Sequence, residues 1–535
     1  MENGKRAEIE KPGSRVKRFA HALASNYLFL GTNIIYTLAS VPLALHYLSK
    51  AEFGLWALSL QIAGYIAWID LGMGSSVARI LIDYKDRRAD GHYGGAIKSG
   101  LLVGTAQGAI TLVTGMSLVW FMATWLRVPA DLSPAFLWLM IGQVLISAVS
   151  FVSRIYYQVL CAWQRMDLYN YSQIAQLATG FVAMWTGFFL GWGVFSLLLG
   201  AAVGWVTGVV FCSTACQRLG IWPKAGEWGR ASWGLFRELF SYGADLFLIA
   251  LGTQLILSSQ TVMVSRELGL ETAALWSVMT KAFTLAGQIV YRNIGYAAPA
   301  FAEMQARHEW ARLWSRYRML FLAINVFGGV CAVIFAACNS PFVTLWTHGE
   351  FSWPVINNVL LAVWLVVTNQ QSCFNSMIAG LKEIHGLKYV YLIEGIVFVC
   401  VTSAVLRRTG ITGMLACSLL ATLSFTWSNG LWRISKISKT GWKPLLWDWQ
   451  VPLFRVLAVM IPCWLAMEWL LQGTSDWLRL AVNGGLLAAI GAWAALRLGL
   501  PSELLAEIAG KLPPILKRLV LCLAGKSCEP GGNPI

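Results

Sequence analysis

Charged side chains inside long apolar stretches are the residues of this chain that could do chemistry. One such group begins at Lys281, and Gln288 and Arg292 lie seven and eleven positions after it. This spacing places all three residues on one face of a helix. Arg154 is a further cation inside another apolar stretch. A charge is costly in hydrocarbon, so such residues face protein or a water-filled cavity, where cations could hold an anionic headgroup.

Two acids in apolar stretches, Asp245 and Glu394, leave a second interpretation open. Buried ions commonly pair, so Arg154 or Arg292 could instead bind one of these acids and hold helices together. Either acid could also bind a coupling ion. Lys281 has no acid at helical spacing in its own stretch, which favours a place in a cavity for its ammonium group.

Amide and aromatic side chains supply groups that could bind the hydroxyls and the faces of sugar rings. The segment around Lys281 has an earlier copy 220 positions before it, as described below. In that copy the positions that correspond to Lys281, Gln288 and Arg292 are Gln61, Trp68 and Gly72. Any one of the 27 tryptophans could equally serve packing or the membrane interface. The further candidates for binding hydroxyls or sugar faces are Tyr65, Asn33, Gln254, Asn26 and Gln260.

Asp70 belongs to an Asp-Leu-Gly triplet within the first copy. The glycines that follow it, Gly72 and Gly74, indicate a helix break. At such a break the carboxylate of Asp70 is better explained as a cap than as a proton site.

Patterns typical of enzymes are missing from the sequence. It contains no H-E-x-x-H, G-x-S-x-G or phosphate-binding loop. The 11 cysteines form no C-x-x-C pair and predict neither a metal site nor a disulfide framework. We therefore expect a protein that is not an enzyme and that uses no metal or cofactor.

The elements that position these residues are membrane-spanning helices. Of the 535 residues, 57% are hydrophobic and only 13% are charged, which is typical of a chain that crosses a membrane many times. Residues 19–49 contain no Lys, Arg, Asp or Glu, and this run exceeds the roughly 20 apolar residues that a helix needs to cross a bilayer. It is also too long for the core of a signal peptide, so the first helix should be retained.

The formal net charge of +15 follows from topology rather than from nucleic-acid binding. With the helices assigned below, most Lys and Arg residues lie on the side of the N-terminus, as the positive-inside rule requires of the cytoplasmic side. Both termini are therefore expected in the cytoplasm, and no nucleic acid is expected as a partner. Loops on the other side are short, which argues against a polytopic glycosyltransferase or ligase.

An internal duplication organises the chain. The tripeptide Leu-Gly-Thr at Leu30 reappears at Leu251, and Trp56 reappears as Trp276, at offsets of 221 and 220. Each half then holds six spans, so the two halves have the same orientation and should be related by an axis along the membrane normal.

The predicted architecture is all-α, with about 14 membrane helices. In the first half they span residues 21–47, 53–78, 99–125, 134–163, 169–190 and 194–217. In the second half they span residues 239–264, 272–300, 319–338, 354–379, 389–406 and 413–434, and two more, 451–471 and 477–496, lie beyond the repeat. The predicted parts are a basic cytoplasmic arm (1–18), an N-lobe (19–218), a cytoplasmic linker (219–237), a C-lobe (238–436), the two extra helices (451–497) and a cytoplasmic tail (498–535).

Two of these helices carry glycine at every fourth position. One has Gly100, Gly104 and Gly108, and the other has Gly200, Gly204 and Gly208. Such faces allow a neighbouring helix to approach closely, so we interpret them as packing features and not as phosphate loops.

The segment from Tyr47 to Arg79 resembles the opening of polysaccharide exporters of the oligosaccharide-flippase type, the group that includes O-antigen-type flippases. These exporters belong to the multidrug, oligosaccharidyl-lipid and polysaccharide exporter superfamily. The element FGLWAL after a short turn and the Asp-Leu-Gly triplet before a basic loop carry the likeness. The duplicated six-helix halves extend it over residues 19–436.

The resemblance implies two six-helix lobes around a central cavity in a multi-pass protein of the inner membrane. It also implies flipping of an undecaprenyl-diphosphate-linked oligosaccharide by alternating access. In that case Arg154, Lys281 and Arg292 would hold the diphosphate, and membrane lipid and a polysaccharide polymerase would be the further partners.

Two other functions stay open at this point. One is a cation-coupled multidrug exporter of the same fold, which would rely on Asp245 and Glu394. The other is a non-transporting scaffold for a polysaccharide synthesis complex.

Overall fold

The computed structural model describes most of the chain, in two compact units. The described residues are 12–70, 73–85, 88, 90–126, 128–230, 234, 237, 248–249, 251–290, 301, 304, 308–381, 386–511, 517, 521–522 and 524. Unit 1 is Met1–Ala250 and unit 2 is Leu251–Ile535. Arg292 and Asp245 lie outside the described residues, as does the side chain of Trp68. The proposed limits of the lobes, linker and tail stay a prediction.

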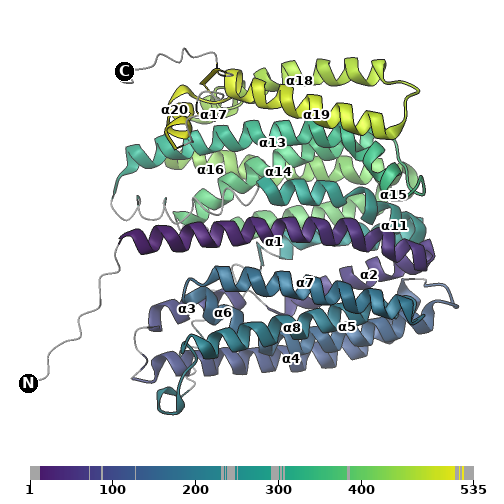
Figure 1. The fold of residues 1–535 in the computed structure, drawn as a ribbon, viewed down its shortest axis with the longest axis vertical. Helices are drawn as coiled ribbons and strands as arrows, with labels where there is room; N and C mark the ends of the chain where they lie inside the picture. Colours follow the sequence, from purple (N-terminus) through teal and green to yellow (C-terminus); the bar gives the residue numbers. More distant parts are fainter. Residues whose placement is uncertain are drawn as a thin grey trace, which may run out of the picture. The chain divides into compact units, whose positions relative to one another are not determined.

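Unit 1 is a bundle of helices in which one of the predicted spans is broken (Figure 1). The predicted helix 53–78 is divided into α2, a short 3-10 turn and α3, whereas the predicted helix 134–163 is one continuous span in which α5 passes into α6 with helical backbone at Arg154. The elements are α1 (Pro12–Tyr47), α2 (Lys50–Ile66), η1 (Ala67–Asp70), α3 (Met73–Tyr84), α4 (His92–Trp125), α5 (Ser133–Ser153), α6 (Ile155–Ala162), α7 (Met166–Phe189), α8 (Phe195–Arg218) and η2 (Ala225–Glu227).

Unit 2 repeats this plan and adds further helices. Gly410 has a positive φ of 61°, which glycine adopts readily, and it divides α15 into the two helices that the sequence predicts there. The elements are α10 (Ser259–Leu268), α11 (Leu270–Met279), α13 (Trp310–Trp346), α14 (Val355–Gly380), α15 (Leu387–Thr422), η3 (Leu423–Trp427), α16 (Ser428–Ser438), α17 (Trp442–Leu446), α18 (Val451–Leu470), α19 (Asp476–Ala494), η4 (Ala495–Gly499) and α20 (Ser502–Lys511).

The ends of the helices keep the spacing of the sequence repeat. Helix α2 begins at Lys50 and α11 begins at Leu270, 220 positions later. Helix α8 ends at Arg218 and α16 ends at Ser438, again 220 positions later. The duplication read from a few matching residues therefore extends to where helices start and stop.

The fold is all-α among the described residues, none of which forms a strand. Eight helices in the described part of the chain are long and apolar enough to cross a membrane. Large apolar side chains such as Phe189, Trp120, Trp469 and Trp477 are well exposed, as expected of a surface that faces lipid. The chain is a multi-pass membrane protein, and the count of about 14 spans stays a prediction.

The glycine faces on α4 and α8 are packing features, as predicted. A Cβ built on Gly104 would lie 2.6 Å from the backbone oxygen of Phe151 on α5. A Cβ built on Gly204 would lie 2.7 Å from the backbone oxygen of Gln176 on α7. Glycine at these positions therefore lets two pairs of helices in unit 1 touch through their backbones.

The added helices of unit 2 are fixed to its repeat by buried amide groups. Asn325 on α13 donates to the Oε1 of Gln450, next to α18, at 2.8 Å, and Gln370 on α14 donates to the Oδ1 of Asn325 at 2.8 Å. The indole of Trp427 donates to the Oε1 of Gln370 at 2.9 Å. Since a buried amide is costly without a partner, these bonds specify where α18 begins to pack.

Candidate functional site

The cation Arg154 lies where α5 passes into α6, and it pairs with Asp70. The Nη2 of Arg154 lies 2.8 Å from the Oδ1 of Asp70, and both side chains are about a quarter exposed. The sequence offered Asp245 or Glu394 as the partner of Arg154 and treated Asp70 as a cap. The structure corrects the partner, because Asp70, the last residue of η1, carries the acid that meets Arg154, whereas the cap role of Asp70 stays a prediction.

Gln107 on α4 connects the end of η1 to Arg154. Its Nε2 donates to the backbone oxygens of Ile69 at 3.2 Å and Asp70 at 2.8 Å, which have lost their helical partners where η1 ends. Its Oε1 accepts a long hydrogen bond from Arg154 at 3.4 Å. The guanidinium of Arg154 also lies 4.9 Å from the ring centre of Phe151. The helix break at η1 is thus connected to Arg154 through both Asp70 and Gln107.

A hollow of about 460 Å³ lies beside this ion pair, inside unit 1. We call it the serine hollow, because three serines of α5 line one wall. Its lining residues come from η1, α5, α6, α7 and α8: Asp70, Ser147, Ser150, Phe151, Ser153, Arg154, Tyr157, Tyr169, Ser172, Gln173, Gln176, Trp205, Gly208, Val209 and Cys212. Apart from Asp70 and Arg154, none of them was a candidate from the sequence.

A weak signal for the serine hollow is present in the sequence. Ser147, Ser150 and Ser153 follow at intervals of three, which puts their hydroxyls along one helix face, and Gln173 and Gln176 do the same on α7. Serine and glutamine are common on membrane helices, so the spacing alone does not show that the two faces meet.

Lys281 of unit 2 is a half-buried cation that follows a second helix break. Helix α11 ends at Met279, and the backbone oxygen of Met279 accepts a hydrogen bond of 3.1 Å from the side chain of Asn339 on α13. Lys281 makes no ion pair or hydrogen bond with any residue in the described part of the chain. Its ammonium group is therefore open to a ligand or to water.

Glu394 on α15 is almost completely buried, with 1% of its surface exposed. Its polar neighbours are Thr422 and Thr426, at the turn where α15 passes into the π-helix η3. Its Oε2 is buried and has no hydrogen-bond partner among the described residues. Neither threonine carries a charge, so the predicted helix-holding ion pair is not seen at Glu394 within the described residues.

The remaining candidates are spread over both units. In unit 1, Gln61 and Tyr65 lie on α2 and Asn33 lies on α1, all half-buried. In unit 2, the Oε1 of Gln254 accepts a hydrogen bond of 2.7 Å from the hydroxyl of Ser258, so one of its amide groups is already engaged by a nearby residue. The last candidates named from the sequence are Gln288, which is half-buried, Gln260, which donates to Ser418 at 3.0 Å, and Asn26 of α1.

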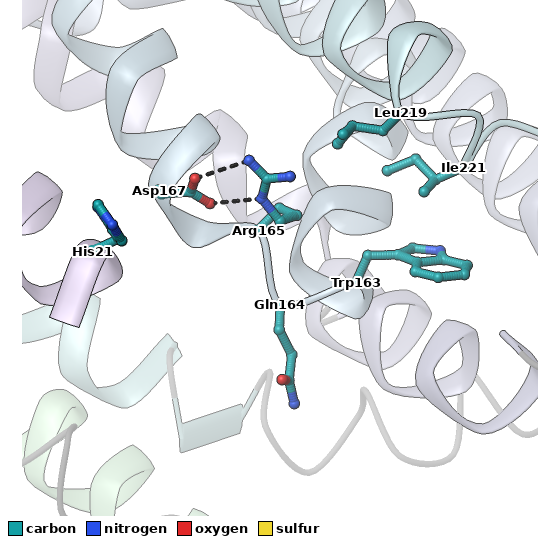
Figure 2. Close-up of a pocket in the computed structure, with 7 residues that line it drawn as sticks. All are labelled: His21, Trp163, Gln164, Arg165, Asp167, Leu219 and Ile221. Carbon is teal, nitrogen blue, oxygen red and sulfur yellow. Dashed lines mark hydrogen bonds and ion pairs between the residues drawn. The ribbon is translucent and has the colours of Figure 1, made fainter. Parts of the chain in front are cut away.

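A second hollow, of about 500 Å³, lies at one end of unit 1. Figure 2 shows its lining residues, with Arg165 and Asp167 pointing toward each other and Leu219, Ile221 and Trp163 on the far side of Arg165. Arg165 makes two hydrogen bonds of 3.0 Å to Asp167. Because this cation is already engaged by an acid, the hollow is a poorer place for a phosphate group than a site with an unpaired cation.

The pKa values of this surface pair follow from the same contact. Burial alone would raise the pKa of Asp167, but the guanidinium of Arg165 outweighs it, and the pKa of Asp167 falls below its usual value of 3.8. The hydrogen bonds from Arg165 to Asp167 raise the pKa of Arg165 in turn. Both groups therefore stay charged at neutral pH.

Comparison with solved structures places the fold among membrane transporters. The chain is similar to an inward-facing multidrug resistance MATE family transporter of the MOP superfamily, with 13% identity, a TM-score of 0.61, and coverage of 76% of this chain and 95% of that one. It is similar to the lipid II flippase MurJ in an inward closed conformation, with 10% identity, a TM-score of 0.61, and coverage of 86% and 98%. At these identities the likeness concerns the fold.

A third similar structure is a MOP superfamily transporter from Pyrococcus furiosus, with 14% identity, a TM-score of 0.50, and coverage of 78% of this chain and 94% of that one. No curated protein sequence matches the chain. The sequence model of the family described as "Polysaccharide biosynthesis protein" matches residues 24–305, more than half of the chain. The chain therefore belongs to this polysaccharide biosynthesis protein family, and its fold is that of a MOP superfamily transporter.

Proposed function

We propose that this protein flips an undecaprenyl-diphosphate-linked oligosaccharide across the cell inner membrane by alternating access, in the synthesis of cell-surface polysaccharide. The family and the transporter fold support movement of a polysaccharide precursor across a membrane. One observation carries the choice of an anionic substrate: Lys281 is a cation within the helices of unit 2 that no described residue neutralises. An unpaired ammonium group in a membrane protein is expected to serve a negatively charged ligand.

In this proposal Lys281 binds the diphosphate together with Arg292, which lies on the same helix face by sequence spacing. Arg154 contributes less, because Asp70 already neutralises it at 2.8 Å. The oligosaccharide hydroxyls would be met by amide and aromatic groups named from the sequence: Gln288, Gln61, Trp68, Tyr65, Asn33 and Gln254. The lipid tail can stay in the bilayer, so only the headgroup needs a hydrated passage.

We also propose that the protein lies in the cell inner membrane. Both termini are cytoplasmic by the distribution of Lys and Arg, and the substrate enters from the cytoplasmic leaflet. Membrane lipid surrounds the protein, a polysaccharide polymerase is the partner that would consume the flipped substrate, and nucleic acid is not a partner.

A flipping assay tests the proposal. The purified protein is placed in vesicles that carry undecaprenyl-diphosphate-linked N-acetylglucosamine with a fluorescent label, and transfer between leaflets is followed by quenching from outside. Lys281→Gln should slow transfer by about tenfold or more, since a hydrogen bond to a charged group contributes about 1.5–3 kcal/mol. Lys281→Arg should keep most of the activity.

The matched control is Arg312→Gln, which removes one positive charge from an exposed position at the start of α13. It should leave transfer unchanged. Equal rates in wild type and Lys281→Gln would discard Lys281 as a substrate ligand, and no transfer by the wild type of this or longer lipid-linked glycans would discard the function.

A cation-coupled multidrug exporter is the second candidate, and the buried carboxylate of Glu394 is the observation that favours it. Asp245 would be its second acid by the sequence. In the same vesicles, efflux of a cationic dye that depends on an ion gradient and is lost in Glu394→Gln would support this function. If the protein moves neither the dye nor the lipid-linked sugar, the result supports the third function, a non-transporting scaffold of the synthesis complex.

A further inference from the structure

The serine hollow presents hydrogen-bond acceptors along α5. The hydroxyl of Ser150 donates to the backbone oxygen of Ser147 at 2.7 Å, and that of Ser153 donates to the backbone oxygen of Ser150 at 3.2 Å. A serine hydroxyl that donates into its own helix keeps its oxygen lone pairs for another donor. This wall can therefore accept hydrogen bonds from a ligand that carries hydroxyl groups.

The opposite wall, from α7 and α8, supplies donors and ring faces. Gln173, Gln176 and the indole of Trp205 line the hollow, and their side chains make no hydrogen bond to a described residue. The rings of Tyr157 and Tyr169 lie with centres 3.9 Å apart at the same hollow. Free amides and an indole N–H beside aromatic faces are the groups that bind a ring with polar edges and apolar faces.

The charges at the hollow balance each other. Asp70 lies beside Arg154, so a phosphate approaching the guanidinium would meet a carboxylate, and a cationic drug approaching the carboxylate would meet the guanidinium. The balance favours a neutral ligand over either ion. The volume, about 460 Å³, falls within the range of about 300–1,000 Å³ typical of small-molecule sites.

We propose that the serine hollow of unit 1 binds an uncharged sugar unit of the oligosaccharide that is transported. This inference rests on the proposed function and names a subsite for it. Each sugar hydroxyl both donates and accepts, which matches the serine oxygens on one wall and the free amides on the other. Trp205 and Tyr169 offer faces for the apolar side of the sugar ring.

Binding of free sugars tests the subsite without any transport. The purified protein is mixed with the methyl glycosides of glucose, galactose, mannose and N-acetylglucosamine, and saturation-transfer NMR measures contact and affinity. We expect at least one glycoside to bind, with an affinity about three- to tenfold lower in Gln173→Ala, as befits one lost neutral hydrogen bond. Trp205→Leu should weaken the same glycoside through loss of its ring face.

The matched control is Gln217→Ala, the same change at an exposed position at the end of α8, which should not alter binding. Thermal unfolding of each variant checks that the helices still pack. If none of the four glycosides binds the wild type, or if Gln173→Ala, Trp205→Leu and Gln217→Ala all bind like the wild type, the subsite is wrong.

The two proposals fail in different ways. Flipping that depends on Lys281, together with no glycoside binding, would leave the flippase and remove the subsite. Glycoside binding that depends on Gln173, with no flipping of any lipid-linked glycan, would keep a sugar site in unit 1 and remove the proposed transport reaction.

Discussion

The two units of this protein treat charges inside their helices in opposite ways. In unit 1 a cation and an acid meet beside the helix break at η1, where Arg154 lies 2.8 Å from Asp70. In unit 2, Lys281 has no ion pair with a described residue, and the buried Glu394 is met by threonines. The helices of both units start and stop with the same spacing, so the duplicated fold does not dictate how the charges are used.

The difference between the two units follows from the free energy of desolvating a charge. A charge taken out of water regains part of the cost only from an opposite charge or from hydrogen bonds. Arg154 and Asp70 regain it from each other, and this contact also connects the helix break at η1 to the span formed by α5 and α6. Lys281 regains nothing from the described part of its unit, so we expect its charge to be retained for a ligand.

The largest expected effect comes from breaking the ion pair between Arg154 and Asp70 in unit 1. Asp70→Asn leaves the guanidinium of Arg154 without a counter-charge, and we expect a loss of about 1–3 kcal/mol in the free energy of unfolding. Fully buried pairs lose about 3–5 kcal/mol, and the partial exposure of this pair reduces the figure. Thermal unfolding in detergent measures it.

The double variant Asp70→Asn with Arg154→Gln serves as the control for that change. It removes both charges, so much of the lost stability should return. If the two single losses simply add, the ion pair does not connect η1 to α5 and α6 as we describe.

An intermediate effect of opposite sign on the free energy of unfolding is expected for Lys281→Gln in unit 2, and it tests the difference between the units. Lys281→Gln removes a charge that has paid for desolvation, so the free energy of unfolding should stay the same or rise by about 1 kcal/mol. The same unfolding experiment measures it beside Asp70→Asn. A loss as large as that of Asp70→Asn would mean that Lys281 has a stabilising partner, and the difference between the units would vanish.

The smallest effect concerns another ion pair of unit 1, between Arg165 and Asp167 at the hollow of Figure 2. The folded pKa of Asp167 is below 3.8, so its stabilising contribution is complete above that pH and is lost as pH falls through the folded pKa. Asp167→Asn should therefore cost about 0.2–1 kcal/mol at pH 7 and at pH 5, and nothing once the carboxyl is protonated. Unfolding by denaturant at several pH values measures this; a cost that grows toward acid pH would contradict the sign.

Some of the architecture could be predicted because its signals are local. Runs without charges, such as residues 19–49, predict membrane helices whatever the rest of the chain does. Gly104 and Gly204 predicted close helix contacts, since only a residue without a side chain allows them. The glycines after Asp70 indicated a break, and η1 ends there.

The candidate site could be predicted only in part. Arg154 and Lys281 stood out because a charge in an apolar stretch is rare. The serines of α5 and the glutamines of α7 did not, because single polar groups on membrane helices are common and gain meaning only when two faces meet.

The sequence by itself determined that this chain crosses the membrane many times, that its helices are duplicated, and which charges lie among them, since all three follow from composition and spacing along the chain. The tertiary structure alone decided that Asp70 neutralises Arg154 while Lys281 has no ion pair with a described residue, and that a polar hollow opens beside the pair in unit 1. The reason is physical: an ion pair or a hollow depends on distances between helices, and the pattern of one helix does not contain the position of the next.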